Sequence, residues 1–421
     1  MNDYNTALTI WSPLAEQGNA KAQYRLGGMY QLGVGVIQDD IQAVRWFQKA
    51  AQQNHPKAQL KLAVMYYNGE GVDQDDVQAV EWFCKAAQQG DAEAQYYLGI
   101  MYELGRGVAQ DDDEAAKWYC KAAEQELSFA QNKLGLTYQL GRGGVARDRA
   151  VKWLQKAAEH GLADAQKALG DMYIWGLDIA QDDVKAAKWY EKAAKQGLAD
   201  AQFKLGLRYD NGDGVAQNYV EAVKWYRKAA RQNHLRAQHN LGVLYGRGDG
   251  VVQSYVQAVQ WYRKAARQNH SPSQLSLGDM YANGKGVAQD GGKAAKWYEK
   301  AAEQGCMFAQ HRLGMMYELG RGVGQSYCEA VYWYRKAAEQ GCDKAQLALG
   351  INYAKGNGVI QDYVTAHFWF NLAGAQGNPQ ARKRRKSIAE RMTPDQIAEA
   401  QRLAREWKSP RKSRSRQMPR G

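Results

Sequence analysis

Three groups of residues have types and spacings that could support chemistry. Ser409 and Lys412 match the Ser-x-x-Lys spacing of acyl-transfer enzymes, but they lie in a tail with no fold to build an oxyanion hole. Segment 210–214 (DNGDG) with Glu221 resembles a calcium loop, yet Val215 stands where that loop requires glycine. The seven histidines show no His-x-x-x-His or Cys/His zinc spacing. We therefore expect no catalytic residues, no metal and no cofactor.

A Gly-x-Gly pair recurs along the chain, as at Gly320 and Gly322. Such a pair could cradle a phosphate, but the third glycine of that motif is missing and no strand pattern precedes the pair. Acidic segments such as 111–114 (DDDE) follow these loops. We interpret them as the starts of helices, where a negative side chain caps and stabilises the first turn.

The loop at Gly320 lies inside a unit, residues 309–344, that predicts two helices. Apolar residues with helical spacing flank the loop, Ala309, Leu313 and Tyr317 before it and Ala330, Trp333, Tyr334 and Ala337 after it. Ser326 is placed to cap the second helix, and Gly341 follows as a stop signal. The unit is an αα-hairpin of a helix A and a helix B. One hairpin cannot bury both apolar faces, whereas a tandem array can.

The unit recurs ten times with a period of 36 residues, except for one step of 35. Each copy has a helix A tyrosine and a helix B tryptophan, from Trp46 to Trp369, and we predict that the tryptophans form a core ladder. Three asparagines replace the glycine of the turn after helix B, and asparagine tolerates the left-handed backbone that this turn requires. Irregular loops in residues 141–179 predict altered curvature of the array there.

The pattern A-Q-x-x-L-G-x-x-Y, followed by G-x-G-V-x-Q-D and A-x-x-W-[YF]-x-K-A-A-x-x-G, resembles the Sel1-like repeat family, which is related to tetratricopeptide repeats. The resemblance covers residues 22–380 fully and 1–21 as a half unit. It implies an all-α fold, a right-handed α/α superhelical solenoid of ten repeats. It also implies a protein-interaction scaffold of the kind found in bacterial signalling, envelope and host-interaction proteins.

The two ends depart from the repeat. Residues 1–21 match a helix B without its helix A, so the apolar residues Ile10, Trp11 and Leu14 lack an evident cover. Three interpretations remain: these apolar side chains are tolerated at the surface, they mediate self-association, or the true start of the protein lies upstream and supplies their cover. At the other end, Thr393, Pro394 and Gln396 predict a capped helix start, and residues 381–407 read as capping helices. Residues 408–421 are basic and without periodicity, which predicts a disordered tail.

We place the candidate partner contacts on the concave face, at helix A positions that the core does not constrain. Many of these positions are large and apolar, which suits an extended peptide or a partner helix. Partial burial against the neighbouring helix A is the competing interpretation. The predicted contacts are Tyr24, Leu60, Tyr96, Ile100, Leu136, Phe203, Leu207, His239, His311 and Met315.

The net charge of +12 is concentrated at the C-terminus, where residues 381–421 have 14 Lys and Arg against 4 Asp and Glu, a balance of +10. This end could contact nucleic acid or another acidic surface, or could simply be a solvated tail. The predicted electrostatic contacts are Arg382, Lys383, Arg384, Arg385, Lys386, Arg411, Lys412 and Arg414.

The sequence therefore predicts a non-enzymatic scaffold that binds a protein or peptide partner of unknown identity. Binding of nucleic acid or an acidic surface through the basic end is an alternative, and a hydrolase acting on cell-wall material is another, although no catalytic constellation supports it. No apolar run reaches transmembrane length, and no signal peptide is visible. Five cysteines, an odd number, predict free thiols, which favours the cytoplasm; a periplasmic or secreted location follows if the true start is upstream.

Overall fold

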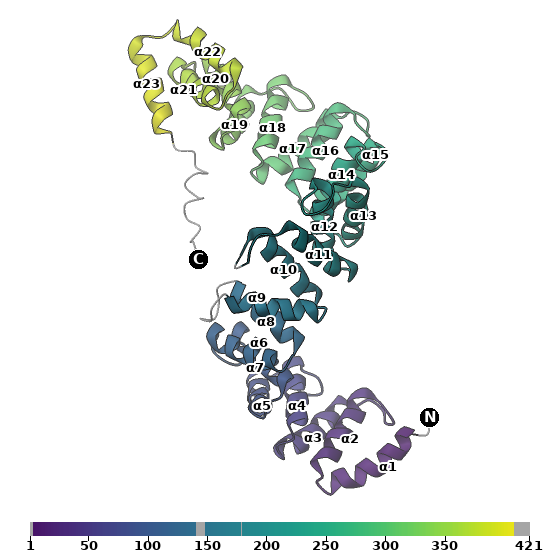
Figure 1. The fold of residues 1–421 in the computed structure, drawn as a ribbon. Coiled ribbons are helices and arrows are strands. Elements are labelled where there is room, and N and C mark those ends of the chain that lie inside the picture. The colour runs from purple at the N-terminus through teal and green to yellow at the C-terminus, as the bar shows by residue number, and fades with distance from the viewer. Residues whose placement is uncertain (1–2, 140–147, 178, 408–421) are drawn as a thin grey trace. The chain divides into compact units, whose positions relative to one another are not determined.

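The computed structural model describes residues 3–139, 148–177 and 179–407. These residues form 23 α-helices and no strand, so the prediction of an all-α solenoid is confirmed. Figure 1 shows the helices in chain order. The shortened loop of segment 141–179 lies partly outside the described residues, and the altered curvature predicted there stays a prediction.

The chain divides into two compact units, residues 1–201 with 213–215 and residues 202–212 with 216–421. The helices of the first unit are α1 (Asp3–Glu16), α2 (Ala20–Leu32), α3 (Asp40–Gln52), α4 (Pro56–Asn68), α5 (Asp76–Gln88), α6 (Ala92–Leu104), α7 (Asp112–Glu124), α8 (Ser128–Gln139), α9 (Asp148–Glu159), α10 (Ala163–Trp175) and α11 (Asp183–Lys195).

The second unit contains most of α12 (Ala199–Asn211) and the helices that follow it. These are α13 (Tyr219–Arg231), α14 (Leu235–Arg247), α15 (Tyr255–Arg267), α16 (Ser271–Asn283), α17 (Gly291–Glu303), α18 (Met307–Leu319), α19 (Tyr327–Glu339), α20 (Asp343–Lys355), α21 (Tyr363–Ala375), α22 (Pro379–Ala389) and α23 (Pro394–Glu406).

The even-numbered helices from α2 to α20 are the helices A of the ten repeats, and each odd-numbered helix that follows is the corresponding helix B. Helix A of the ninth repeat ends at Gly320, whose left-handed φ of 65° allows its N–H to bond Met316 O. Helix B begins at Ser326, whose side chain accepts a hydrogen bond from the N–H of Glu329. The loop glycines and polar caps are therefore structural, as the sequence predicted.

The turn after helix B needs a left-handed residue, and asparagine provides it where glycine is absent. Asn54, Asn233 and Asn269 have φ angles of 61°, 62° and 61°, which confirms the prediction for these turns. Glu126 adopts the same conformation with φ 62°, although glutamate has no local hydrogen bond that favours it.

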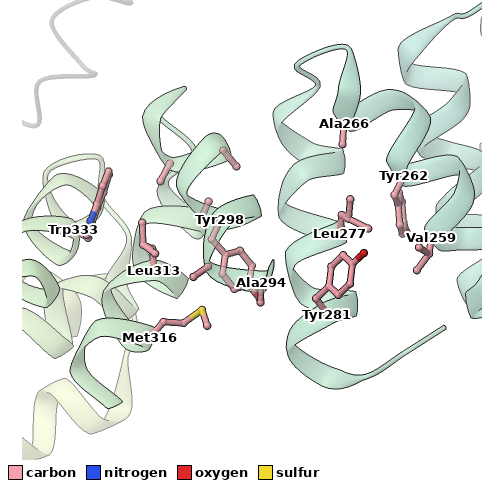
Figure 2. Close-up of a cluster of buried hydrophobic side chains, with 14 of the residues drawn as sticks. Val259, Tyr262, Ala266, Leu277, Tyr281, Ala294, Tyr298, Leu313, Met316 and Trp333 are labelled. Carbon is pink, nitrogen blue, oxygen red and sulfur yellow. The ribbon is translucent and has the colours of Figure 1, made fainter. Parts of the chain in front are cut away.

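The core of nine of the ten repeats is centred on the aromatic residue after the helix B tryptophan; the fourth repeat has the buried Leu154 there. Tyr119, Tyr226 and Tyr334 are 0% exposed and Tyr298 is 2% exposed. They pack against the small residues of helix A and the alanines of helix B. Figure 2 shows part of this core in the second unit, with Tyr298 and Leu313 among its side chains.

The tryptophan ladder is a core feature only in part. Trp225, Trp333 and Trp369 are buried, but the other seven helix B tryptophans are half-buried. A lysine three residues later covers the ring; Lys121 Nζ, for example, lies 3.9 Å from the centroid of Trp118. The predicted core ladder is thus corrected, because one face of most tryptophans packs inward while the other meets a lysine at the surface.

A row of buried glutamines links successive repeats. Gln310 Nε2 donates to the carbonyl of Ala302, 3.0 Å away, at the end of the preceding helix B. Its Oε1 accepts from Gln340 Nε2, 2.8 Å away, in the next turn. The same pair of bonds recurs at Gln59, Gln95 and Gln346, among others. The row gives each of these helix-end carbonyls a second hydrogen bond in addition to the one from the turn, and it ties each helix A to the neighbouring turns.

The helix start predicted near the C-terminal end is present. Thr393 and Gln396 form a capping box with Pro394 at the start of α23, and α23 packs on α21 through Trp407, whose ring lies 5.6 Å from that of Trp369. In the part of the chain that the structure describes, no helix is long and apolar enough to cross a membrane. All five cysteines are free thiols, as predicted.

Candidate functional site

Most of the predicted contacts lie half-buried on the helices A. The residues that keep a partly exposed side chain are Tyr24 on α2, Tyr96 and Ile100 on α6, Leu136 on α8, Leu207 on α12, His239 on α14, and His311 and Met315 on α18. The first four belong to one compact unit and the others to the second. Each unit therefore presents partly exposed side chains on its helices A.

Leu60 and Phe203 require a correction, because they are buried to 2% and 7% exposure. Leu60 belongs to the core shared with Phe83. Phe203 stacks on His234 of the following turn, with ring centroids 4.6 Å apart. The turn after helix B covers Phe203, and packing in the core around Phe83 covers Leu60, so neither residue is part of the candidate contact surface.

Paired tyrosines and carboxylates on the same surface were missed by the sequence reasoning. In five repeats, the buried helix B tyrosine donates its hydroxyl hydrogen bond to an acidic residue on helix A. The pairs are Tyr119 with Glu103 (2.6 Å), Tyr190 with Asp171 (2.6 Å), Tyr226 with Asp210 (3.0 Å), Tyr298 with Asp279 (2.6 Å) and Tyr334 with Glu318 (2.7 Å).

The sequence does contain a signal for these pairs. Where the aromatic residue is Phe47, Phe83 or Phe370, the two helix A positions that hold the acids elsewhere contain no carboxylate. Phenylalanine has no hydroxyl to donate, so an acid at these positions accompanies a tyrosine, although Tyr262, with Gly246 and Val243 there, is a tyrosine without an acid. Burial and the neighbouring carboxylate raise the pKa of Tyr334 well above its usual range, and the hydroxyl therefore stays protonated and donates.

A groove of about 650 Å³ opens on the helix A surface of the last two repeats. His311 and Met315 of α18 face Leu347 and Ile351 of α20 across it, and the Glu318 carboxylate also lines it. Burial, together with the charges of Arg312 and Lys344, lowers the pKa of His311 to about 4, so its imidazole is neutral at pH 7. The groove thus joins apolar walls to one of the tyrosine-bound carboxylates.

The basic helix α22 has two kinds of cation. Arg382 Nε donates to the carbonyl of Gly374, 3.0 Å away, where the other repeats place a glutamine, and Arg385 donates to Asn371 Oδ1 at 2.8 Å. Lys383, Arg384 and Lys386 are exposed. The last three are therefore the ones that remain available for the predicted electrostatic contact, while Arg411, Lys412 and Arg414 lie outside the described residues.

Two histidines share one serine hydroxyl at the junction of the seventh and eighth repeats. His239 Nδ1 and His270 Nδ1 lie 3.0 and 2.8 Å from Ser273 Oγ. Burial, reinforced by His270, lowers the pKa of His239 to about 4, and burial also lowers the pKa of His270. Both rings are therefore neutral at pH 7, and charging either one must break this arrangement or expose it to water.

Acidification is expected to destabilise this junction. Between pH 6.5 and about 4 the unfolded chain binds a proton at His239 that the native state does not, so native stability falls as the pH falls through this range. We expect the free energy of unfolding to fall by about 2 kcal/mol over this range, after allowing for the partial exposure of the ring. Melting temperatures measured from pH 7.5 to 4 should depend less on pH for His239→Phe than for the unmodified protein. Phenylalanine is chosen because it is the residue at the equivalent position of the preceding repeat, position 203. Identical profiles for the two proteins would contradict the assignment.

The comparisons with known proteins place the repeats in one family. The Sel1 repeat model matches ten segments, residues 20–55, 56–91, 92–127, 128–162, 163–198, 199–234, 235–270, 271–306, 308–342 and 343–378. The chain belongs to the Sel1 repeat family. These segments leave α1, α22 and α23 outside the repeats.

The solved structure of another Sel1-type protein is similar over nearly the whole length. This is c5321, a protective antigen present in uropathogenic Escherichia coli strains and displaying an SLR fold; the match has 37% identity, covers 99% of this chain and 90% of that chain, and has a TM-score of 0.88. A Sel1 repeat protein from Oxalobacter formigenes is 32% identical over 81% of this chain and 89% of that chain, with a TM-score of 0.45. No curated protein matches the chain.

Sel1 repeat proteins generally mediate protein–protein interactions, and their solenoid is typically a non-catalytic scaffold. In this Sel1 repeat chain, no group of three or more His, Cys, Asp or Glu residues is arranged to hold a metal ion within the described segments.

Proposed function

We propose that this chain is a scaffold that binds a protein partner on the helix A surface of its last two repeats. The observation that carries the proposal is the groove between α18 and α20, where Met315, Leu347 and Ile351 supply apolar walls to a partly exposed hollow. Apolar side chains in such a position gain free energy when a partner excludes water from them. Their types also vary from repeat to repeat, unlike the residues of the core.

Family membership supports an interaction scaffold in general, and the groove supplies a specific place for the contact. A wall of side chains on two neighbouring helices A suits an extended peptide or a helix laid across the repeats. The predicted cytoplasmic location and the predicted contact of the basic C-terminus with an acidic surface or nucleic acid stay predictions.

Site-specific photocrosslinking in the native cell tests this proposal. A benzophenone amino acid placed at Met315 or Ile351 is expected to crosslink the same partner protein, identified by mass spectrometry. The matched control is Tyr332, an exposed aromatic residue on helix B α19, where the same probe should yield little of that partner. Equal crosslinking from position 332, or no shared partner from 315 and 351, would refute the assignment of this surface.

A further inference from the structure

The Glu318 carboxylate in the groove has a tyrosine partner but no positive one. Its Oε2 accepts the hydrogen bond of Tyr334, 2.7 Å away. Among the described residues, no lysine or arginine forms an ion pair with it within 4.0 Å. A partly buried carboxylate without a cation is costly, and among the five tyrosine-bound acids, all within the described residues, Glu318 shares this lack of an ion pair with Asp210, whereas Glu103, Asp171 and Asp279 have one.

The third and fourth repeats show what a complete site of this kind looks like. Glu103 accepts a hydrogen bond from Tyr119, which lies 16 residues later, as Tyr334 follows Glu318 by 16. Lys133, 30 residues after Glu103, comes from the next helix A and places its Nζ 2.9 Å from the same Glu103 oxygen. The residue 30 positions after Glu318 is Ala348. The ninth repeat thus keeps the acid and the tyrosine and lacks the cation.

Two of the other acids have a cation beside them, and the fourth pair has instead an amide that bonds its tyrosine. Arg312 Nε lies 3.5 Å from Asp279, and Lys167 Nζ lies 3.2 Å from Asp171. At the pair of Asp210 and Tyr226, Asn240 donates a hydrogen bond to the tyrosine hydroxyl at 3.0 Å; Asn240 is the residue equivalent to Lys133 and Ala348. Alanine at this position removes the side chain that would neutralise the acid and leaves space in its place.

The surroundings of Glu318 favour a cation with an apolar stem. Met315, Leu347 and Ile351 line the groove and can pack against methylene groups. Two carboxylates, Glu318 and Asp343, face one ammonium group, Lys344, so the charged lining has a net negative charge while His311 is neutral. Asp343 Oδ2 already accepts a hydrogen bond from Asn378 at 2.9 Å, which leaves Glu318 as the acid that lacks a positive or capping donor.

We propose that this groove binds a lysine or arginine side chain of the partner protein, whose cationic group takes the place beside Glu318 that Lys133 holds beside Glu103. The inference rests on the proposed function and adds the chemistry of the contact. The partner's methylene groups lie against Met315, Leu347 and Ile351, and its positive charge meets the carboxylate that Tyr334 orients. The charged pair supplies specificity for a basic residue, while the apolar walls supply contact area.

The test uses the full chain labelled with ¹³C at its methionine methyl groups, so that the Met315 signal reports on the groove. The probe is the peptide acetyl-Leu-Ala-Arg-Ala-Leu-amide, and its matched counterpart contains citrulline, which keeps the shape of arginine without the charge. Titration should give a dissociation constant at least about 10-fold lower for the arginine peptide than for the citrulline peptide. Equal affinities, or no shift of the Met315 signal, would overturn the proposal.

Two variants test the role of the Glu318 charge: one removes the negative charge, and the other supplies a positive charge beside it. Glu318→Gln keeps an acceptor for Tyr334 and removes the charge, so it should weaken arginine-peptide binding about 10-fold and leave citrulline-peptide binding unchanged. Ala348→Lys supplies an internal ammonium group, as Lys133 does for Glu103, and should abolish the preference for arginine while the protein stays folded. The control, Glu103→Gln, should leave binding in the groove unchanged. A preference for arginine that survives both groove variants would contradict the assigned role of Glu318.

The chain's own basic tail is the competing occupant, because residues 408–421 contain six Lys and Arg residues. Removal of residues 408–421 should leave the affinity for the arginine peptide unchanged. A gain of about 10-fold or more on removal would mean that the tail fills the groove, and would overturn the assignment to a partner. Crosslinking from positions 315 and 351 reports on the proposed scaffold function separately, since those contacts can persist when the charge preference is absent.

Discussion

Replacement of Gly286 by alanine is expected to destabilise the array by about 3–5 kcal/mol. Gly286 is the second glycine of its loop and has a φ of +70°, which a residue with a side chain adopts only at a cost. A Cβ atom there would lie 2.3 Å from the carbonyl carbon and oxygen of Tyr255 at the start of α15. Because the obstacle is backbone of the preceding repeat, no rotation of a side chain can relieve the contact, and the repeats must move apart.

Gly305 provides the matched control for this change. It has a similar φ of +83°, but no heavy atom lies within 4 Å of an added Cβ. Gly305→Ala should therefore add only the strain of the left-handed backbone and lower the free energy of unfolding by about 1 kcal/mol. Because unfolding of a long array is not an all-or-none transition, amide hydrogen exchange in α15, α16 and α17 is the appropriate measurement, supported by the denaturation midpoint. Comparable loss of protection in the two variants would show that close approach of the repeats is not the cause.

The second large effect is expected for Gln310→Leu. The side chain of Gln310 is 3% exposed and connects the carbonyl of Ala302 with the amide of Gln340. Leucine has a similar volume but offers neither a donor nor an acceptor. The Ala302 carbonyl then keeps only its backbone bond from the N–H of Gly305, 3.0 Å away, and Gln340 keeps only its bond to the carbonyl of Lys336. Because two hydrogen bonds are lost but neither partner is left without one, we expect the free energy of unfolding to fall by about 1–2 kcal/mol, with the effect located at the contact of the eighth and ninth repeats.

The control for the glutamine change is Gln361→Leu, since Gln361 Nε2 also donates to a backbone carbonyl, that of Ala354 at 2.8 Å, but at an exposed position. Water replaces that bond, and the change should cost no more than about 0.5 kcal/mol. Thermal melting and hydrogen exchange of α17 and α18 compare the two variants. Similar losses at positions 310 and 361 would argue against the buried row of glutamines as a link between repeats.

Much of the fold follows from local pattern. Several features depend only on residues close together in sequence. They are the 36-residue period, the helix caps at Ser326 and Thr393, and the left-handed turns at Asn54 and Asn233. Local backbone geometry and helix capping decide these features, so they are readable without knowledge of distant contacts. The same reasoning overstated the burial of the tryptophans, because regular recurrence does not say which face of a side chain meets water.

The candidate site was predictable only in outline. The sequence indicated the helix A positions, but it could not separate Phe203, which the next turn covers, from Leu207 one turn later, which stays partly exposed. It also did not reveal the acid at Glu318 as a partner of Tyr334, since the two residues lie on different helices. Whether a given helix A side chain is buried depends on the side chains of the neighbouring repeat that pack against it, and those contacts are known only from the tertiary structure.

The sequence by itself determined that this protein is a tandem array of Sel1 repeats, because each repeat is one local hairpin whose apolar faces require a copy on either side. Only the tertiary structure decided where the array is open to a partner. The groove between α18 and α20 exists because side chains of two repeats meet around Ala348. The Glu318 carboxylate lacks a cation there because alanine occupies the position that Lys133 fills beside Glu103. Those relationships join residues about 30 positions apart, and they become visible only when one repeat is stacked on the next.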